Sequence, residues 1–379
     1  MDKTMTTEIF KTMCPMNCHP TLCGMKVQVR DQQLVSIEGD EENPDSQGVL
    51  CVRGNSAHEI VGNPARLLMP MIRENAATDE WQEADWGECL DFIAQKMKTV
   101  GRESVGFWQG HGNAANDYGF GLKRGQMERF ANIYGCQFWN PAMICWGLGG
   151  LGFGLTGALE TSTKEDMSAN SELIVLWGAN AVSQANTMKH VDKAKRRGVR
   201  LVVVDVRKTE AAALADDFYL IKPGTDTDLA LAMMHVIINN DLVDHSFIDN
   251  HTVGFAELRK HVSQLTPAWA APRTGIPEEA IVSLAQNYAA TEAAMIIVGG
   301  SSMHKGDNTW QAARAISCLP GLTGKFGKPG AGIGPRHGSR SHGAGFVDLS
   351  LPEARPDGCL LYTSPSPRDA TLSRMPSSA

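Results

Sequence analysis

The chain lacks an excess of positive charge, and it lacks any long apolar run. Among its 379 residues, 35 are lysine or arginine and 42 are aspartate or glutamate, which gives a formal net charge of −7. A chain with this balance and no basic stripe has no electrostatic attraction to nucleic acid or to an anionic membrane surface. No segment approaches the roughly 20 consecutive apolar residues that a membrane-spanning helix needs. We therefore expect no nucleic-acid partner and no membrane insertion.

The first residues also lack the features of an export signal. Residues 1–11 carry four charged side chains and no apolar stretch, whereas a secretory signal needs an apolar core and the other bacterial export route needs paired arginines. We therefore expect a cytoplasmic protein. Because the cytoplasm keeps thiols reduced, the nine cysteines favour metal or redox use over a disulfide framework.

Four of these cysteines gather near the amino terminus. Cys14, Cys18 and Cys23 lie within ten residues of one another, and Cys51 follows them. Three close thiols and one remote thiol suit a cubane cluster, in which each of four irons needs a thiolate at a separate corner. A structural zinc also takes four thiolates, but such sites usually come as two matched Cys-x-x-Cys pairs. We favour an iron–sulfur cluster, with zinc as the alternative.

Local patterns predict secondary structure around and after this cluster. Residues 25–29 and 33–37 alternate in polarity and predict a β-hairpin. Asp85 and Glu88 have the spacing of a capping box, and the apolar residues that follow lie on one face of a helix to residue 100. A strand at residues 104–108 ends in a glycine-rich loop. This is a first α/β unit.

Short apolar runs then alternate with amphipathic stretches. Strands are predicted at residues 173–177, 200–205 and 294–298, and helices at 189–197, 228–238 and 308–319. Such alternation implies a parallel sheet with crossover helices. The expected fold class is α/β, with a small β-rich iron–sulfur domain followed by two Rossmann-like parallel α/β domains. The expected domains are residues 1–57, residues 58–140 continued by 338–358, and residues 141–337.

Glycines and polar residues follow the predicted strands. The segments 177–180, 204–207 and 222–226 favour nucleotide contacts, because glycine lets a phosphate approach the backbone and Asp205 or Asp226 could accept hydrogen bonds from a guanine edge or a ribose. Each signal is weak alone, since such a glycine is often only a turn and such an aspartate often caps a helix. The chain has no G-x-G-x-x-G run, which argues against an ordinary nicotinamide site.

One further cysteine, Cys145, lies in the glycine-rich loop 139–150. A lone cysteine in apolar surroundings is usually a small buried residue. The loop position and the adjacent glycines weaken that interpretation, because they let the backbone approach a large ligand. Cys89, Cys136 and Cys318 have no such setting, and we interpret them as core thiols.

Taken together, the cysteine cluster, the Cys145 loop and the strand-end motifs resemble the molybdopterin oxidoreductase superfamily, which includes formate dehydrogenases, nitrate reductases and dimethyl sulfoxide reductases. The resemblance covers residues 12–350, and the order of its motifs is specific: 51–54, 63–67, 177–180, 204–207, 224–226 and 322–332. It implies a 4Fe-4S cluster and a molybdenum (or tungsten) bis(molybdopterin guanine dinucleotide). It also implies a C-terminal β-barrel domain, which we expect to be absent from this chain.

The resemblance assigns roles to individual residues. Cys14, Cys18, Cys23 and Cys51 would bind the cluster, Cys145 would be the protein ligand to the metal, and Arg53 would lie between cluster and pterin. The dinucleotide contacts would be Gly178, Asn180, Asp205, Arg207, Gly224 and Asp226 for the first, and Gly299, Gly300 and His304 for the second.

The chain also departs from the formate dehydrogenases. Trp146 stands at the catalytic position where they have a histidine after the metal ligand. Their arginine after the Gly-Lys-Pro segment is matched by Arg336 only if the alignment shifts by one residue. The resemblance therefore identifies the family and leaves the substrate open.

The expected function is oxygen-atom or hydride-equivalent transfer to or from a small-molecule substrate, with an electron-carrier protein or redox subunit as partner. Formate oxidation is one candidate, reduction of an anion or a sulfur compound another, and non-redox hydration a minor variant. The alternative is a non-catalytic iron–sulfur electron-transfer subunit of the same fold. Such a subunit would have no reason to keep Cys145 or the nucleotide cradles, so we favour the enzyme.

The last residues, 359–379, read naturally as a translated sequencing adaptor. Their serine- and proline-rich composition would otherwise indicate a disordered end. We expect this tail to be non-native, Cys359 to have no function, and the chain to be a fragment of a longer enzyme.

Overall fold

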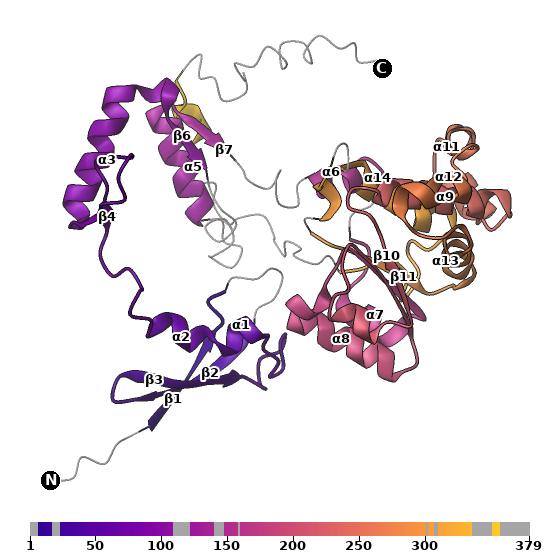
Figure 1. The fold of residues 1–379 in the computed structure, drawn as a ribbon, viewed down its shortest axis with the longest axis horizontal. Helices are drawn as coiled ribbons and strands as arrows, with labels where there is room; N and C mark the ends of the chain where they lie inside the picture. Colours follow the sequence, from indigo (N-terminus) through magenta and orange to yellow (C-terminus); the bar gives the residue numbers. More distant parts are fainter. Residues whose placement is uncertain are drawn as a thin grey trace. The chain divides into compact units, whose positions relative to one another are not determined.

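The computed structural model describes residues 7–16, 23–108, 122–139, 148–157, 160–300, 302–306, 310–335 and 351–356 (Figure 1). Contacts divide the chain into two units, Met1–His58 with Ala142–Ser341 and Glu59–Pro141 with His342–Ala379. Within the described ranges, no helix is both long and apolar enough to cross a membrane. The predictions for Cys18, Cys145, Trp146, Arg336 and the tail 359–379 fall outside the described residues.

The first unit begins with a three-stranded antiparallel sheet formed by β1 (Thr7–Met13), β2 (Gly24–Arg30) and β3 (Gln33–Gly39). The hairpin β2–β3 is the one that the alternation predicted, and its turn residues Asp31 and Gln32 adopt positive φ angles. β1 was not predicted. Six of its seven residues are exposed, so no apolar run marks it in the sequence. The short helix α1 (Val52–Asn55) follows, and α2 (Ala57–Val61) spans the division between the two units.

A five-stranded parallel sheet forms the centre of the first unit. Its order is β10 (Asp217–Leu220), β9 (Arg200–Asp205), β8 (Leu173–Trp177), β11 (Ala294–Val298) and β12 (Gly332–Ile333). The apolar runs predicted β8, β9 and β11 with these bounds, whereas β10 and β12 were missed because they are short. The chain starts at β8 in the middle, extends through β9 to β10, and then crosses to β11 on the other side. The strand order therefore reverses between β8 and β11, and open α/β sheets bind ligands at the point where the strand order reverses.

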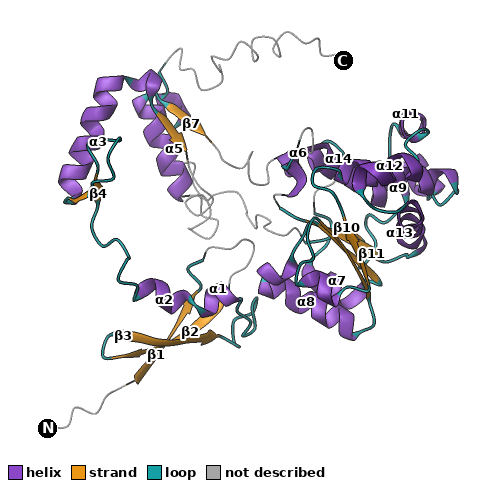
Figure 2. Ribbon diagram, in the orientation of Figure 1, coloured by secondary structure: helices purple, strands orange, loops and turns teal. Residues whose placement is uncertain are grey.

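Helices cover both faces of this sheet (Figure 2). Alternate residues of β8 point to opposite faces, because Leu173, Val175 and Trp177 join one buried apolar cluster while Ile174 and Leu176 join the other. The second cluster includes side chains of α7 (Lys164–Asn170) and α8 (Ala185–Arg196). The first cluster is covered by helices α6 (Leu148–Gly154), α9 (Asp226–Asn239), α10 (His245–His251), α11 (Phe255–Val262), α12 (Pro267–Thr274), α13 (Glu278–Ala290) and α14 (Trp310–Leu322).

The second unit contains a smaller α/β arrangement. Its elements are β4 (Met71–Ile72), β5 (Gln82–Glu83), α3 (Trp86–Val100), β6 (Gly106–Trp108), α5 (Leu122–Tyr134) and β7 (Gln137–Trp139), and β6 pairs with β7 in parallel. The predicted cap of α3 is confirmed, since the Asp85 carboxylate accepts a hydrogen bond from the backbone N–H of Glu88 at 2.8 Å. The predicted fold class, a small β-rich part followed by parallel α/β parts, is also confirmed.

Candidate iron–sulfur and cofactor sites

Three of the four predicted cluster ligands lie on adjoining segments of the first unit. The backbone N–H of Cys14, after β1, donates to the carbonyl of Cys23, before β2, at 2.9 Å. Cys51 is the N-cap of α1. A Cβ atom added at Gly54 in α1 would lie 3.6 Å from the sulfur of Cys14, so that thiol packs close to α1. The fourth predicted ligand, Cys18, lies outside the described residues.

The environment of Cys51 favours its thiolate form. Burial by itself raises the pKa of this thiol, but hydrogen bonds from the backbone N–H of Gly54 and from Arg53 outweigh it and lower the pKa. A helix N-terminus and a neighbouring arginine are the features that stabilise thiolates in proteins, and the thiolate is the form that binds metal. In the described ranges no three acidic, histidine or cysteine side chains converge on a single metal ion. A cubane cluster does not require that convergence, because each thiolate binds a different iron.

The predicted nucleotide contacts gather at the carboxyl edge of the central sheet. In the register of the sheet, Trp177 at the end of β8 pairs with Val204 of β9 and with Val298 of β11. Gly178, Asp205 and Gly299 therefore lie beside one another at this edge. The pairing of β10 with β9 brings the segment from Gly224 to Asp226 to the same edge.

The turns after β8 and β11 touch. A Cβ atom added at Gly299 would lie 1.8 Å from the carbonyl oxygen of Gly178, and one added at Gly178 would lie 2.6 Å from the hydroxyl of Ser302. Gly178 also has a φ of +58°, a conformation that side chains disfavour. Only glycine fits at both positions, so the two turns pack directly against each other at the carboxyl edge, where open α/β sheets bind ligands.

The two predicted aspartates differ in their surroundings. Asp226 is 6% exposed and accepts a hydrogen bond from the indole Nε1 of Trp177 at 2.8 Å. Burial raises the pKa of Asp226 despite that bond, and the nearby charge of Asp205 raises it further. The Asp205 carboxylate accepts a longer bond, at 3.3 Å, from the backbone of Arg207. Asp226 therefore bonds Trp177, a contact that the sequence did not indicate, whereas Asp205, which is also buried, has the weaker of the two bonds.

Asn180 carries a buried acceptor at this edge. Its Nδ2 donates to Glu210 at 2.7 Å, and Glu210 lies 3.6 Å from Arg207. The backbone N–H of Glu210 and then Asn180 lower the pKa of that carboxyl group, so it stays ionised. Among the described residues, the buried Oδ1 of Asn180 has no hydrogen-bond partner. Glycine turns, an acidic acceptor and an unused amide oxygen fit a guanine dinucleotide, whose base has donors and whose phosphates approach backbone.

Arg53 connects the cysteine hairpin, by which we mean β1–β3 together with Cys14, Cys23 and Cys51, to this edge. Its Nη2 donates to the carbonyl oxygen of Ser183 at 2.5 Å. Ser183 ends the 3₁₀ turn η3 (Ala181–Ser183), which directly follows Gly178 and Asn180. Arg53 thus connects α1, which follows the cysteines, to the segment after β8, and its position between a cluster and a pterin stays a prediction.

The loop that contains Cys145 and Trp146 lies outside the described residues, but the chain that follows it does not. A Cβ atom added at Gly149 would lie 3.5 Å from Met303 and 3.9 Å from the carbonyl oxygen of Gly300. Both residues follow β11, and Met303 lies in η5 (Ser302–His304). The chain therefore re-enters the described structure beside the second predicted cradle. Nothing is described for the side chain of His304.

One residue of the motif at 322–332 has a different role. Lys325 is 2% exposed, and its ammonium group donates to the carbonyls of Thr291 at 2.5 Å and Ala289 at 3.3 Å. Burial lowers its pKa to about 8. These carbonyls end α13, where a cation is favourable, and they precede β11, so the lysine lies away from the carboxyl edge.

Comparison with known proteins identifies the family of this chain. Residues 66–360 match the molybdopterin oxidoreductase family, and residues 7–63 match the molybdopterin oxidoreductase Fe4S4 domain. The probable oxidoreductase YoaE of Bacillus subtilis is 30% identical, in an alignment that covers 98% of this chain and 53% of the relative. The formate dehydrogenase 1 subunit alpha of Methanococcus maripaludis is 32% identical, with 93% and 51% covered.

A solved structure resembles the whole described fold. Acetylene hydratase from Pelobacter acetylenicus superposes with a TM-score of 0.69 at 25% identity, covering 91% of this chain and 47% of that one. The chain spans about half the length of these relatives. The matches confirm the predicted cofactor classes, a 4Fe-4S cluster and a molybdopterin. The chain belongs to the molybdopterin oxidoreductase family and carries that family's Fe4S4 domain at residues 7–63.

Proposed function

We propose that this chain is part of a cytoplasmic molybdenum (or tungsten) bis-pterin oxidoreductase that transfers an oxygen atom or a hydride equivalent. One observation carries the proposal: two glycine turns, after β8 and β11, meet at one edge of the sheet, and Arg53 ties the cysteine hairpin to that edge. A cluster and a dinucleotide cofactor bound at these places would be neighbours, as electron transfer between them requires.

The residues of the hairpin hold and tune the cluster. Cys14, Cys18, Cys23 and Cys51 supply four thiolates, and the lowered pKa of Cys51 favours metal binding at neutral pH. The guanidinium of Arg53 places a positive charge on the path between the hairpin and the β8 turn. That charge lowers the energy of an electron on this path, because the two interact across a partly shielded medium.

The residues of the carboxyl edge bind and orient the pterin. When bound, the molybdopterin supplies the two-electron chemistry, and the protein positions it, excludes water and sets potentials. The first dinucleotide contacts Gly178, Asn180, Asp205, Arg207, Gly224 and Asp226, and the second contacts Gly299, Gly300 and His304. Cys145 would supply the thiolate ligand to the metal, and Trp146, which follows it in the sequence, would take the catalytic position that a histidine has in formate dehydrogenases.

Formate is the leading substrate candidate, because a relative of 32% identity is named a formate dehydrogenase subunit. That name also supports a redox subunit or electron-carrier protein as partner. Trp146 in place of histidine keeps reduction of an anion or a sulfur compound as a second candidate. Hydration of a triple bond is the third, supported by the similarity to acetylene hydratase.

The test is an anaerobic assay of the full-length holoenzyme. Formate oxidation and the reduction of nitrate and dimethyl sulfoxide are each coupled to a viologen dye, and acetylene hydration is followed without dye. We expect dye-coupled turnover with one redox substrate. Hydration without dye-coupled turnover would replace the redox proposal, and no turnover in a protein that carries iron but neither molybdenum nor tungsten would favour the electron-transfer alternative.

A further inference from the structure

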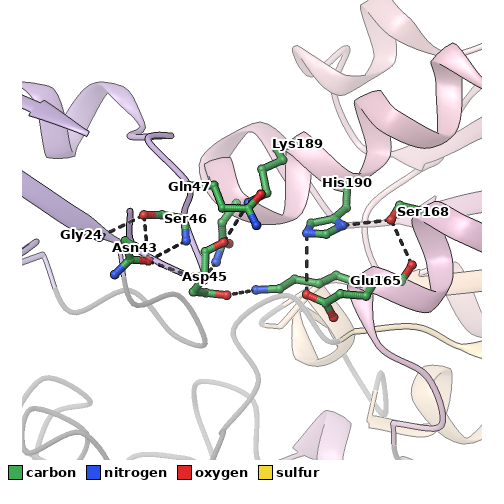
Figure 3. A network of polar contacts seen from close by, with 11 residues as sticks. Gly24, Asn43, Asp45, Ser46, Gln47, Glu165, Ser168, Lys189 and His190 are labelled. Atoms are coloured by element: carbon green, nitrogen blue, oxygen red, sulfur yellow. Dashed lines mark hydrogen bonds and ion pairs between the residues drawn. The ribbon is translucent and has the colours of Figure 1, made fainter. Parts of the chain in front are cut away.

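A polar network joins the loop between β3 and α1 to the helices α7 and α8 (Figure 3). At its centre, the carboxylate of Asp45 accepts hydrogen bonds from the ammonium group of Lys164 and, at 2.7 Å, from Nδ2 of Asn186. The backbone carbonyl of Asp45 accepts a third, at 2.8 Å, from Lys189, which also donates to Gln47 at 3.1 Å. Side chains from two helices thus hold Asp45 in the loop that follows the cysteine hairpin.

The centre of the network is partly shielded from water, while Gln47 at its edge is exposed. The side chains of Lys164 and Asp45 are 15% and 25% exposed, and Asn186 is fully buried. Exposed ion pairs contribute little to stability, because water and salt screen them. A shielded carboxylate bound through both oxygens has a fixed geometry and a stronger charge interaction. Asp45 is therefore an anchor rather than a surface ion pair.

The loop that carries Asp45 is rigidly attached to the predicted cluster ligands. Oδ1 of Asn43 accepts hydrogen bonds from the backbone of Asp45 at 3.0 Å and of Ser46 at 2.8 Å. The hydroxyl of Ser46 in turn accepts from the backbone of Gly24 at 3.0 Å, and Gly24 directly follows Cys23. A Cβ atom added at Gly24 would lie 2.5 Å from the Asn43 side chain, so these segments are in tight contact.

On its other side, Asp45 is attached to α8, which follows the carboxyl edge of the central sheet. Asn186 and Lys189 lie in the first turns of α8, and α8 follows η3, whose last residue Ser183 accepts the hydrogen bond from Arg53. The hairpin is thus fixed to the segment after β8 at two places, through Arg53 and through Asp45.

We propose that Asp45 is a positioning residue that fixes the iron–sulfur cluster relative to the pterin and so sets the rate of electron transfer between them. The proposal rests on the proposed function. Electron transfer depends steeply on distance, so a small displacement of the hairpin slows the electron without changing the chemistry at the metal. Asp45 acts through its loop, which leads to Cys51 and is bonded through Ser46 to Gly24, the residue after Cys23.

The experiment compares three variants of the holoenzyme. Asp45→Ala removes the anchor, and Asp45→Asn keeps its shape but removes its charge. Glu42→Ala is the matched control, because Glu42 is a carboxylate of the same loop that is 75% exposed and pairs with Lys11 inside the hairpin. The readouts are iron and molybdenum content, the magnetic coupling between reduced cluster and paramagnetic molybdenum, and the rates at which substrate reduces the molybdenum and then the cluster.

In Asp45→Ala we expect unchanged metal content, weaker magnetic coupling, and cluster reduction slowed roughly ten- to a hundredfold, as for other small misplacements of reacting groups. Reduction of the molybdenum by substrate stays at its original rate. The magnetic coupling and the rate of cluster reduction in Asp45→Asn should lie between those of Asp45→Ala and of the parent. In Glu42→Ala both should equal those of the parent. Unchanged coupling and cluster reduction in Asp45→Ala would overturn the proposal, and so would an equal slowing of both steps.

A second measurement separates this proposal from the proposed function. Hydrogen exchange at residues 40–48 and 185–189 should rise in Asp45→Ala but not in Glu42→Ala, whatever reaction the enzyme catalyses. Unchanged exchange contradicts the anchor even in an active enzyme. A parent protein that binds neither molybdenum nor tungsten overturns both proposals. If hydrogen exchange still rises when Asp45→Ala is introduced into that protein, the anchoring contacts exist even though they position no pterin.

Discussion

The amino-terminal sheet and the central sheet of the first unit are built on different principles. All five residues of β8 are at most 2% exposed, and those of β11 are too. In β1–β3, which the structure describes in full, the fully buried apolar side chain is Met25. Burying one apolar side chain contributes about 1.5–3 kcal/mol, which cannot offset the entropy lost by ordering three strands. The central sheet is therefore stabilised by its core, and the hairpin depends on polar anchors and on its cluster.

Because the core of the central sheet stabilises the fold, a residue that only takes part in catalysis can be replaced without unfolding the protein. The largest expected effect on turnover comes from such a residue. Under the proposed function Cys145 is the protein ligand to the metal, so replacing it with alanine should abolish turnover of the full-length enzyme. Iron content and thermal unfolding should remain nearly unchanged. If the variant keeps the parent rate, Cys145 is a core thiol and the assigned ligand is wrong.

The second prediction tests whether the hairpin depends on its metal. Replacing Cys51 with serine should lower the iron content and raise hydrogen exchange across β1–β3, because the hairpin loses the ligand bonds that replace an apolar core. Exchange in β8, β9 and β11 should not change.

Cys318→Ala is the control for that variant. Cys318 is a partly buried thiol of α14 whose pKa burial raises, and it donates a hydrogen bond to the carbonyl of Arg314. It should leave the iron content intact. Equal loss of protection in both sheets of Cys51→Ser contradicts the separation of the two regions.

The third prediction compares apolar truncations in the two sheets. Leu176 in β8 is 0% exposed, so Leu176→Ala should lower the free energy of unfolding by about 3 kcal/mol through lost burial and a residual cavity. Val35 in β3 is 43% exposed, and Val35→Ala should change it by less than about 0.5 kcal/mol. Denaturant titrations of both variants measure the difference. Similar losses would show that the hairpin has a core of its own.

The smallest effect depends on pH. Burial, the largest cause, acts with the charges of Lys189, Lys164 and Lys193 and against that of Glu165 to lower the pKa of His190 to about 4. Its ring also contacts the Ser168 hydroxyl at 3.0 Å. Between pH 6.5 and 4 the unfolded chain therefore binds more protons at this site, so stability falls as the pH falls.

Substituting His190 with glutamine should remove that part of the pH dependence, which is at most about 3 kcal/mol. Unfolding free energies of parent and variant, measured at pH 7 and pH 4.5, test this. The parent should lose more stability than the variant over this interval. Equal losses would mean that His190 is protonated as easily in the folded protein as in the unfolded one.

The same difference between the sheets explains what the sequence revealed. The strands β8, β9 and β11 are continuous apolar runs, and they were predicted with their observed bounds. β1 is exposed and β12 has two residues, so neither has a pattern that distinguishes it from a loop. The helices α10–α13 were not predicted, and α12 carries prolines at its first position and in its interior, which weakens the helical pattern.

The site shows the same limit. Motif order identified the family and its cofactor classes, and Gly178, Gly299 and Gly300 were singled out because they follow apolar runs. The contact of Gly178 with Gly299 depends on strand register, which a single sequence does not contain. The bonds of Arg53 and Asp45 to the segment after β8 join residues more than a hundred positions apart, and only the folded chain reveals them. The roles of individual site residues stay predictions.

Cofactor analysis of the anaerobically purified full-length enzyme decides whether the hairpin and the carboxyl edge hold these two cofactors. We expect about four irons per chain, together with molybdenum or tungsten and a guanine nucleotide released from the pterin on acid treatment. We also expect Cys145→Ala to keep the iron. Stoichiometric zinc with no iron absorbance and no guanine nucleotide would contradict these expectations. The cysteine hairpin would then be a zinc site, and the carboxyl edge of the central sheet would hold no dinucleotide.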